Sequence, residues 1–299
     1  IEGQVCPKGS FVIKLSGDEK IKKLHKTLTV PPIYTNEKSE TEKLEIPSIG
    51  LVESWFHDMD AGWTRFVFDS YNIPFKVIRP GEFKDLDFSE YDVIIFPDEN
   101  KSILLNGKYK SGDSYYMTSY APEYAKGMEK EGLKKLMEFV NEGGKIISWG
   151  QSTGLFEGTF KINEDEEQEE EFQLPFRDIS DNFQKEGVYC PGSLVRMKLT
   201  ENHPLTAGMP DECGIFYRGR TLFSTSVPNF DMDRRVIGII PEKEILLSGY
   251  CENEEKLGNK SVMIWLSKGK GNMVLMGFNP QFRSSTHVTY KLLFNSILL

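Results

Sequence analysis

The sequence predicts an α/β fold with a mainly parallel sheet and a β-rich C-terminal part. Two short apolar runs, Val93–Phe96 and Lys145–Trp149, flank a helical pattern. That pattern places apolar residues at i, i+3, i+4 and i+7: Leu133, Leu136, Met137 and Val140. A strand, a helix and a strand in this order form a parallel βαβ unit, whose crossover is almost always right-handed. From Ser193 onward the pattern changes to further strand-like runs: 194–199, 236–240, 245–250, 262–266 and 273–278.

The elements before this unit divide the chain into an N-terminal segment, 1–45, and a main domain, 46–299. Gly9–Leu15 is typical of a strand, and a short helix is expected from Asp18 with Ile21, Leu24 and Leu28 facing inward. The polar, proline-broken stretch up to Glu45 indicates a linker. The main sheet is expected to start at Ile46–Val52. A helix follows from about Asp60, with one face formed by Trp63, Phe66, Val67 and Tyr71, and Phe75–Ile78 is the next strand.

Four later segments complete the prediction. Residues 101–125 have no periodicity and are expected to form a loop over the strand ends. Residues 160–173 form an acidic insertion, which we interpret as a solvated loop because blocks of like charge repel one another. Lys268–Asn272 is a hairpin turn. The chain then ends in a helix whose inward residues are Tyr290, Leu293, Phe294, Ile297 and Leu298.

The composition excludes several classes of protein. Hydrophobic residues make up 39% of the chain and charged residues 27%, which is typical of a globular domain with a real core. The net charge of −9 argues against nucleic-acid binding, which needs a basic face. No apolar run approaches the roughly 20 residues of a membrane span. The chain begins with Ile1 rather than Met, and we interpret it as a mature form or a fragment of something longer.

The cysteine and histidine patterns argue against familiar metal and redox motifs. Cys6, Cys190, Cys213 and Cys251 are far apart and include no CxxC, so both free thiols and disulfides stay open. No metal site and no cofactor are predicted, because His57 beside Asp58 and Asp60 lacks a second ligand cluster.

The sharpest chemical signal is Gly150-Gln151-Ser152-Thr153-Gly154, a G-x-S-x-G directly after a strand. In a nucleophile elbow such glycines let the backbone turn tightly and hold the serine at the strand end. The best-placed base is His287, at the start of the last helix, although a helix N-terminus favours neutral imidazole. Two hypotheses follow: a serine hydrolase with Ser152 and His287, or a structural strand-to-helix turn.

The other candidate residues also follow strands, where open α/β sheets bind ligands. Asp98 and Glu99 end the strand Val93–Phe96 and are predicted to act as an acid, a base or a hydrogen-bond acceptor, or else to cap a turn. Trp55, Asp60 and Arg65 follow the first strand, and aromatics mixed with Asp and Arg suit sugar or peptide binding. The alternative is that Asp60 is a helix N-cap and Trp63 a core residue. Gln151 and Arg283 complete the predicted ligand-binding set.

The assembled motifs resemble one specific group of proteins. These motifs are Met59–Arg65, Tyr91–Asp98, Gly143-Gly144, Tyr189–Leu194, His203-Pro204-Leu205, Gly208-Met209-Pro210, Leu246–Gly249, Gly277–Arg283 and Lys291–Asn295. From about residue 46 to 299 the chain is similar to the class I glutamine-amidotransferase-like domain that follows the catalytic domain in bacterial M14-family zinc carboxypeptidase-like proteins.

The resemblance implies a flavodoxin-like sheet, a secreted or periplasmic location and a peptidase domain in the same parent polypeptide. It does not imply amidotransferase activity. Ser152 stands where that family carries its cysteine, and no histidine here is followed two residues later by Glu. The zinc carboxypeptidase motif is also absent from the sequence. The leading hypothesis is therefore a catalytically degenerate accessory domain that binds a small molecule, glycan or peptide at the strand ends. A structural or dimerising role is a further alternative.

Overall fold

The computed structural model describes residues 9–14, 23, 27, 32–36, 41, 43–56, 58–111, 114–116, 121–162, 170–200, 202–229 and 231–299. The chain divides into two compact units, Ile1–Glu45 and Ile46–Leu299. In the first unit the strand predicted at Gly9–Leu15 is wrong for residues 10–14, which form no strand and expose Phe11 and Ile13. An apolar run becomes a stable strand only when neighbouring strands and a core accept it. The helix predicted from Asp18 lies almost wholly outside the described residues.

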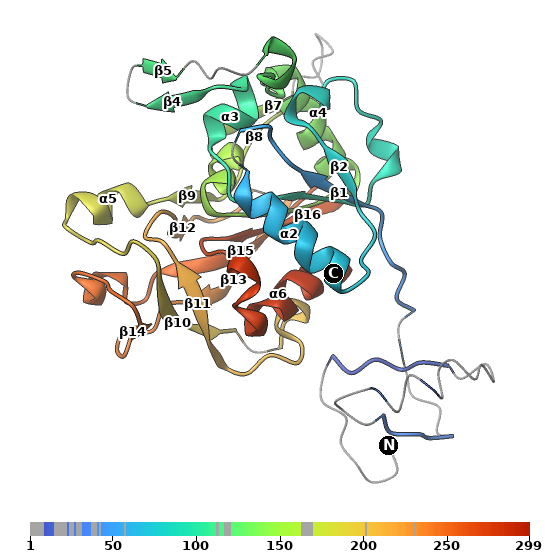
Figure 1. Cartoon of the computed structure of the whole chain (residues 1–299), viewed down its shortest axis with the longest axis vertical. Coiled ribbons are helices and arrows are strands. Elements are labelled where there is room, and N and C mark those ends of the chain that lie inside the picture. The colour runs from blue at the N-terminus through green and yellow to red at the C-terminus, as the bar shows by residue number, and fades with distance from the viewer. Residues whose placement is uncertain are drawn as a thin grey trace. The chain divides into compact units, whose positions relative to one another are not determined.

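The second unit contains a parallel sheet, with four strands from its first half and one from near its C-terminal end (Figure 1). Its strands are β1 (Ile49–Val52), β2 (Lys76–Ile78), β3 (Val93–Phe96), β6 (Lys145–Trp149) and β16 (Gly271–Met276). They lie in the order β2-β1-β3-β6-β16, and every neighbouring pair is parallel. Numbered along the chain this is 2-1-3-4-5, the flavodoxin-like order of doubly wound sheets. The predicted α/β class, its mainly parallel sheet and the flavodoxin-like arrangement are therefore confirmed.

Beyond β16 the same sheet continues with antiparallel strands. Its path runs β16-β15-β13-β10-β11, through β15 (Ser261–Lys268), β13 (Met232–Ile239), β10 (Ser193–Leu199) and β11 (Glu212–Tyr217). Three short strands pair off this path: β9 (Phe176–Asp178), β12 (Phe223–Thr225) and β14 (Leu246–Ser248). This gives a sheet of twelve strands in the described part of the chain. The predicted β-rich C-terminal part and the hairpin between β15 and β16 are confirmed.

Helices cover both faces of the parallel strands. Helix α2 (Met59–Ser70) and the C-terminal α6 (His287–Leu298) pack on one face, with Leu51 and Ile95 beneath them. Helix α3 (Lys101–Asn106) and α4 (Glu129–Glu142) pack on the other, against Val52 and Ile94. Successive residues of one strand thus pack into the hydrophobic cores on opposite faces of the sheet. This explains why these strands are apolar at every position and do not alternate with polar residues.

Shorter elements connect these layers. They are α5 (Ser180–Lys185) and the 3-10 turns η1 (Pro80–Glu82), η2 (Phe88–Glu90), η3 (Pro122–Tyr124), η4 (Gly150–Phe156), η5 (Pro204–Thr206), η6 (Glu254–Leu257) and η7 (Phe282–Ser284).

Two predicted loops contain regular structure. Residues 101–125 hold α3 and a hairpin of β4 (Tyr109–Ser111) and β5 (Ser114–Tyr116). The helix forms because Asn100 accepts from the N–H of Ser102 at 2.8 Å, and Gly107 ends it in the left-handed region at φ +68°. The acidic insertion begins and ends in paired strands, β7 (Thr159–Ile162) and β8 (Glu170–Gln173). Most of the acids between them lie outside the described residues.

The predicted inward face of α2 needs correction. Its buried residues are Ala61, Thr64, Val67 and Phe68. Phe66 and Tyr71 are 53% and 55% exposed, and Trp63 is only partly buried. The face of α2 that packs on the sheet therefore includes the ring of Phe68, whereas the rings of Phe66 and Tyr71 lie outside it.

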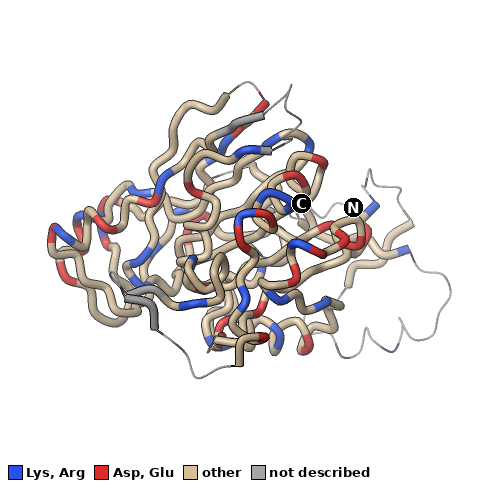
Figure 2. Tube along the Cα trace, turned by 90° about the horizontal axis from the view of Figure 1, so that it is seen from above, with Lys and Arg blue, Asp and Glu red and all other residues tan. Residues whose placement is uncertain are grey.

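Acidic and basic residues are interspersed along the described chain (Figure 2). None of the described helices combines the length and the apolar composition that crossing a membrane requires.

Candidate functional site

Four carboxylates lie at the carboxyl ends of β1 and β3, where the sheet order predicts a crevice. Asp58 and Asp60 follow β1, and Asp98 and Glu99 follow β3. Asp58 is the N-cap of α2: its Oδ1 accepts from the N–H of Ala61 at 3.0 Å, and its Oδ2 accepts from the N–H of Ser54 at 2.9 Å. The prediction that Asp60 is the N-cap is therefore wrong, because Asp60 turns into the protein.

Asp60 is a polar hub that joins four parts of the sheet edge. Its Oδ2 accepts from the indole N–H of Trp149 and from the N–H of Asp98 at 3.0 Å. Its Oδ1 accepts from Asn279 Nδ2 at 3.1 Å and Gln281 Nε2 at 3.0 Å. Burial, with the nearby charge of Asp98, raises the pKa of Asp60 to about 6. Every partner is a donor, so the ionised carboxylate is the form that fits this position.

The G-x-S-x-G turn forms η4 and is tied to β3. Asp98 Oδ1 accepts from the N–H of Gln151 at 2.9 Å. Gly150 has φ +61°, and a Cβ there would lie 2.4 Å from Asp98 Oδ1. Gly154 has ordinary φ and open space around it. Only the first glycine of the motif is therefore required by the backbone.

Ser152 is fully buried, and its hydroxyl makes hydrogen bonds to the backbone. Its Oγ accepts from the N–H of Glu99 at 2.8 Å and donates to the carbonyl of Pro97, with the Glu99 carbonyl at 3.1 Å. His287 is exposed at the start of α6, with Nε2 3.0 Å from the Ser284 carbonyl and its ring 5.1 Å from that of Tyr290. Both residues are described, and no hydrogen bond joins them. Their catalytic assignment stays a prediction, and this geometry gives Ser152 a role in holding β3 to η4.

Glu99 connects this network to the loop after β1. Its Oε2 accepts from Ser54 Oγ at 2.7 Å, and its Oε1 accepts from the N–H of Asn100 at 2.6 Å. Burial raises the pKa of Glu99 to about 7, and burial also raises that of Asp58 to about 7. In both cases the neighbouring carboxylates add to the effect. The site thus holds carboxyl groups that titrate near neutral pH, which is a property found often at functional sites.

These raised pKa values predict how stability depends on pH. A carboxyl whose pKa is higher in the folded chain binds more protons there than in the unfolded chain, so stability falls as pH rises between the two values. For Glu99 this window runs from the ordinary glutamate pKa of 4.5 to about 7. In Glu99→Gln the amide oxygen can still accept from the N–H of Asn100, and the amide NH2 can donate to Ser54 Oγ, so both contacts persist without the charge. We expect the variant to lose less stability on going from pH 5 to pH 8, by up to about 1.4 kcal/mol per pH unit.

Urea unfolding at a series of pH values measures this difference. Glu242→Gln, which removes an exposed carboxylate, is the matched control and should keep the wild-type pH profile. Equal profiles for the Glu99 variant and the wild type would contradict the assignment.

A pocket of about 300 Å³ lies beside the carboxylates, over the ends of β1 and β2. Its walls are Ser54, Trp55, Phe56, Arg79, Pro80, Gly81, Glu82, Ile103, Gly107, Glu123, Tyr124 and Lys126. Trp55 and Tyr124 meet edge to face with ring centroids 5.0 Å apart, and they are 46% and 47% exposed. The Arg79 guanidinium lies 3.7 Å from the Trp55 ring centroid. The pocket therefore combines aromatic surface with charged groups, as ligand sites do.

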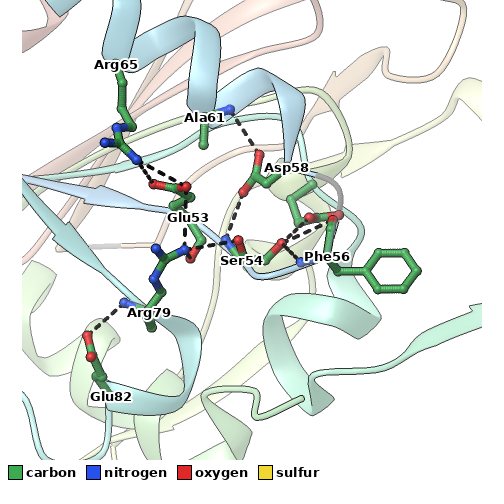
Figure 3. A network of polar contacts seen from close by, with 9 residues as sticks. Glu53, Ser54, Phe56, Asp58, Ala61, Arg65, Arg79 and Glu82 are labelled. Atoms are coloured by element: carbon green, nitrogen blue, oxygen red, sulfur yellow. Dashed lines mark hydrogen bonds and ion pairs between the residues drawn. The ribbon is translucent and has the colours of Figure 1, made fainter. Parts of the chain in front are cut away.

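The arginine in this wall is fixed by a polar network (Figure 3). Arg79 Nη1 donates to the carbonyls of Glu53 at 3.0 Å and Ser54 at 3.1 Å. Glu53 also forms an ion pair with Arg65 at 3.0 Å. At the other side, the N–H of Arg79 donates to Glu82 Oε2 at 2.8 Å. The Arg79 side chain is thus held in place before any ligand arrives.

The predicted ligand-binding residues separate into three groups. Trp55 forms a pocket wall, and Glu99 and Arg65 support that wall through Ser54 and Glu53. Asp60, Asp98 and Gln151 belong to the network under the strand ends. Arg283 is apart from the pocket lining, exposed in η7 at φ +46°, with its guanidinium 5.3 Å from the Phe282 ring. The ligand-binding role of all of them stays a prediction.

Arg79 and Tyr124 were missed by the sequence analysis. Arg79-Pro80-Gly81 directly follows the strand Phe75–Ile78, and this position alone was a usable signal, because it marks the carboxyl end of a parallel strand. Tyr124 gave no such signal, since it reaches the site from a segment without periodicity. Among the described residues, no group of three or more His, Cys, Asp and Glu has the arrangement of a metal site.

Comparisons with known proteins found similarity to solved structures only. No protein-family profile matches the sequence, and no curated protein does. Among solved structures the chain is similar to a ThuA-like protein from Bacteroides uniformis, with 12% identity, a TM-score of 0.45 and 87% and 94% of the two chains covered. It is also similar to a glutamine amidotransferase from Thermotoga maritima, with 11% identity, a TM-score of 0.45 and coverage of 85% and 97%. A β-galactosidase from Bacillus circulans matches over 84% of this chain and 31% of its own, with 11% identity and a TM-score of 0.43. The fold assignment rests on the strand order, since all three TM-scores are below 0.5.

Proposed function

We propose that this chain is a non-catalytic binding domain that takes a sugar unit of a glycan in the pocket beside Trp55. The observation that carries this proposal is the pocket wall itself, with exposed Trp55 and Tyr124 faces next to a guanidinium held by two backbone carbonyls and the Trp55 ring. Sugars offer apolar C–H faces that stack on aromatic rings and hydroxyls that bond to charged groups. The volume of about 300 Å³ matches the lower end of small-molecule sites, roughly 300 Å³.

The state of Ser152 favours binding over hydrolysis. A nucleophile needs its hydroxyl exposed to the substrate and a base within hydrogen-bond reach. The Ser152 hydroxyl has no exposed surface and is bonded to the backbone around Pro97 and Glu99. In the proposal the turn that contains Ser152 has a structural role only. The ligand binds to the aromatic side of the pocket, over the ends of β1 and β2. The role is that of an accessory domain, joined to an M14-type peptidase domain as the sequence resemblance implies.

Loss of the Trp55 ring is expected to weaken ligand binding at least tenfold. A glycan array identifies the sugar, and isothermal titration of the best hit compares wild type with Trp55→Ala. One stacked aromatic ring is worth about 1.5 kcal/mol, which is about tenfold in Kd. Phe66→Ala is the matched control, because Phe66 is similarly exposed at 53% and is not part of the pocket lining.

Other outcomes separate the alternatives. Binding to peptides on an array that Trp55→Ala weakens would support the pocket as the binding site but make its ligand a peptide instead of a glycan. Labelling by a fluorophosphonate probe that disappears in Ser152→Ala would instead support a serine hydrolase. Glycan binding that is unchanged in Trp55→Ala would contradict the proposed site.

A further inference from the structure

Two cysteines that are far apart in the sequence lie opposite each other near β10. Cys190 follows α5, and Cys251 follows β14. Their neighbours Tyr189 and Glu252 form an antiparallel β-bridge, with N–H to carbonyl distances of 3.3 Å and 2.9 Å in the two directions. This reciprocal exchange makes Tyr189 and Glu252 a hydrogen-bonded pair, so Cys190 and Cys251 form the adjacent non-hydrogen-bonded pair. Cα atoms of such pairs are about 4.5 Å apart, within the range of roughly 4.4–6.8 Å that a disulfide spans.

In the reduced form each thiol donates to a backbone carbonyl, Cys190 to that of Tyr217 at 3.6 Å and Cys251 to that of Glu252 at 4.0 Å. The interaction between the two thiols lowers the pKa of Cys190 and raises that of Cys251. Cys190 is buried at 3% exposure, whereas Cys251 is partly exposed. The pair therefore has an accessible member and a buried member with increased thiolate character, an arrangement suited to thiol–disulfide exchange.

The backbone around the pair is held in place by other bonds. Ser193 Oγ donates to the Tyr250 carbonyl at 2.7 Å and accepts from the Tyr250 N–H at 2.9 Å. The rings of Tyr189 and Tyr250 also meet, with centroids 6.4 Å apart. These contacts clamp the two segments together on both sides of the cysteines. A disulfide without strain requires two segments that are already held side by side in this way.

We propose that Cys190 and Cys251 are a redox modification site that closes into a cross-strand disulfide. The oxidant is a low-molecular-weight disulfide such as oxidised glutathione. One sulfur of the pair attacks it as the thiolate, forms a mixed disulfide and releases one thiolate. The other sulfur of the pair then attacks the protein sulfur of that mixed disulfide and releases the second. Two S–H bonds lose their protons, the S–S bond of the reagent breaks, and one S–S bond forms in the protein.

The cross-link would fasten the entrance of β10 to the segment after β14. It closes a loop of roughly 60 residues, and a disulfide stabilises mainly by restricting the unfolded chain. The oxidised protein is therefore expected to unfold at a higher temperature than the reduced protein, by about 5 °C. This expectation is independent of the proposed ligand pocket, because neither cysteine lines it.

Peptide mapping tests the proposal directly. The folded full chain is incubated with oxidised glutathione near pH 8, free thiols are blocked, and a non-reducing digest is read by mass spectrometry. We expect a peptide pair linked through Cys190 and Cys251 and a raised Tm that a reductant reverses. Cys251→Ser should lose both effects. Cys213→Ser should keep them, because Cys213 is buried on β11, where burial raises its pKa to about 11.

Three results would overturn the proposal. These are glutathione left on Cys251 without the internal bond, a link from either residue to Cys6 or Cys213, or two thiols that stay free in the folded wild type. The wild-type digest decides between them even if a serine variant fails to fold.

Discussion

Asp60→Ala is expected to destabilise the main domain by about 3–4 kcal/mol, because four buried donors lose their acceptor together. The indole of Trp149, the amides of Asn279 and Gln281 and the N–H of Asp98 all converge on this carboxylate. Alanine also leaves a hole that water does not enter easily between α2 and the strand ends. The loss is measured by urea unfolding at pH 7.

Asp69→Ala is the control for this experiment. Asp69 lies on the same helix but is exposed, so its removal should change stability by less than about 0.5 kcal/mol. If both variants unfold at the same urea concentration, Asp60 is not the hub that its contacts indicate. The raised pKa of Asp60, about 6, adds a further expectation: the destabilisation should be smaller at pH 8 than at pH 5, because a carboxyl whose pKa is raised in the folded chain contributes stability that falls as pH rises from its ordinary value to about 6.

Gly150→Ala is expected to cost about 2–4 kcal/mol, whereas Gly154→Ala should be close to neutral. At Gly150 the backbone has φ +61°, and an added Cβ would lie 2.4 Å from Asp98 Oδ1. The left-handed conformation alone costs about 1–2 kcal/mol for a residue with a side chain, and the contact must also be relieved. At Gly154 the φ is ordinary and nothing lies within 4 Å of an added Cβ.

Thermal unfolding of the two alanine variants measures this contrast within one motif. If both alanine variants unfold at the same temperature, the turn does not depend on the left-handed backbone conformation of Gly150. Since a shift of the turn would also move Gln151 away from Asp98, the Gly150 variant should show increased amide exchange at Gln151.

The sequence was most informative for the buried parallel strands. Val93–Phe96 and Lys145–Trp149 are short apolar runs bounded by polar or glycine residues, and their type follows from burial on both faces. The partner of β6 on its other side was not predictable. It is β16, which returns only after the antiparallel strands, and pairing over such a distance leaves no local pattern. The strand β11 was missed because Gly214 interrupts its alternation.

The candidate site was predictable only in part. The parallel order placed Asp98 and the Ser152 turn at neighbouring strand ends, and the Asp98 to Gln151 hydrogen bond reflects that proximity. The direction of each side chain was not available from spacing. Asp58 and Asp60 are two residues apart, yet one caps a helix and the other accepts bonds from three strand ends. That difference depends on the donors of Trp149 and Asn279, which are far along the chain.

The position of β16 has a consequence for how the protein is made. One edge of β6, residues 145–149, has no strand partner until residues 272–276 pair with it. During synthesis the nascent chain therefore carries an apolar strand with unpaired N–H and carbonyl groups until residues 272–276 have left the ribosome. Truncations that end before β16 should accumulate as aggregates rather than as smaller folded domains. This dependence on distant contacts also favours slow folding over a rapid collapse of local units.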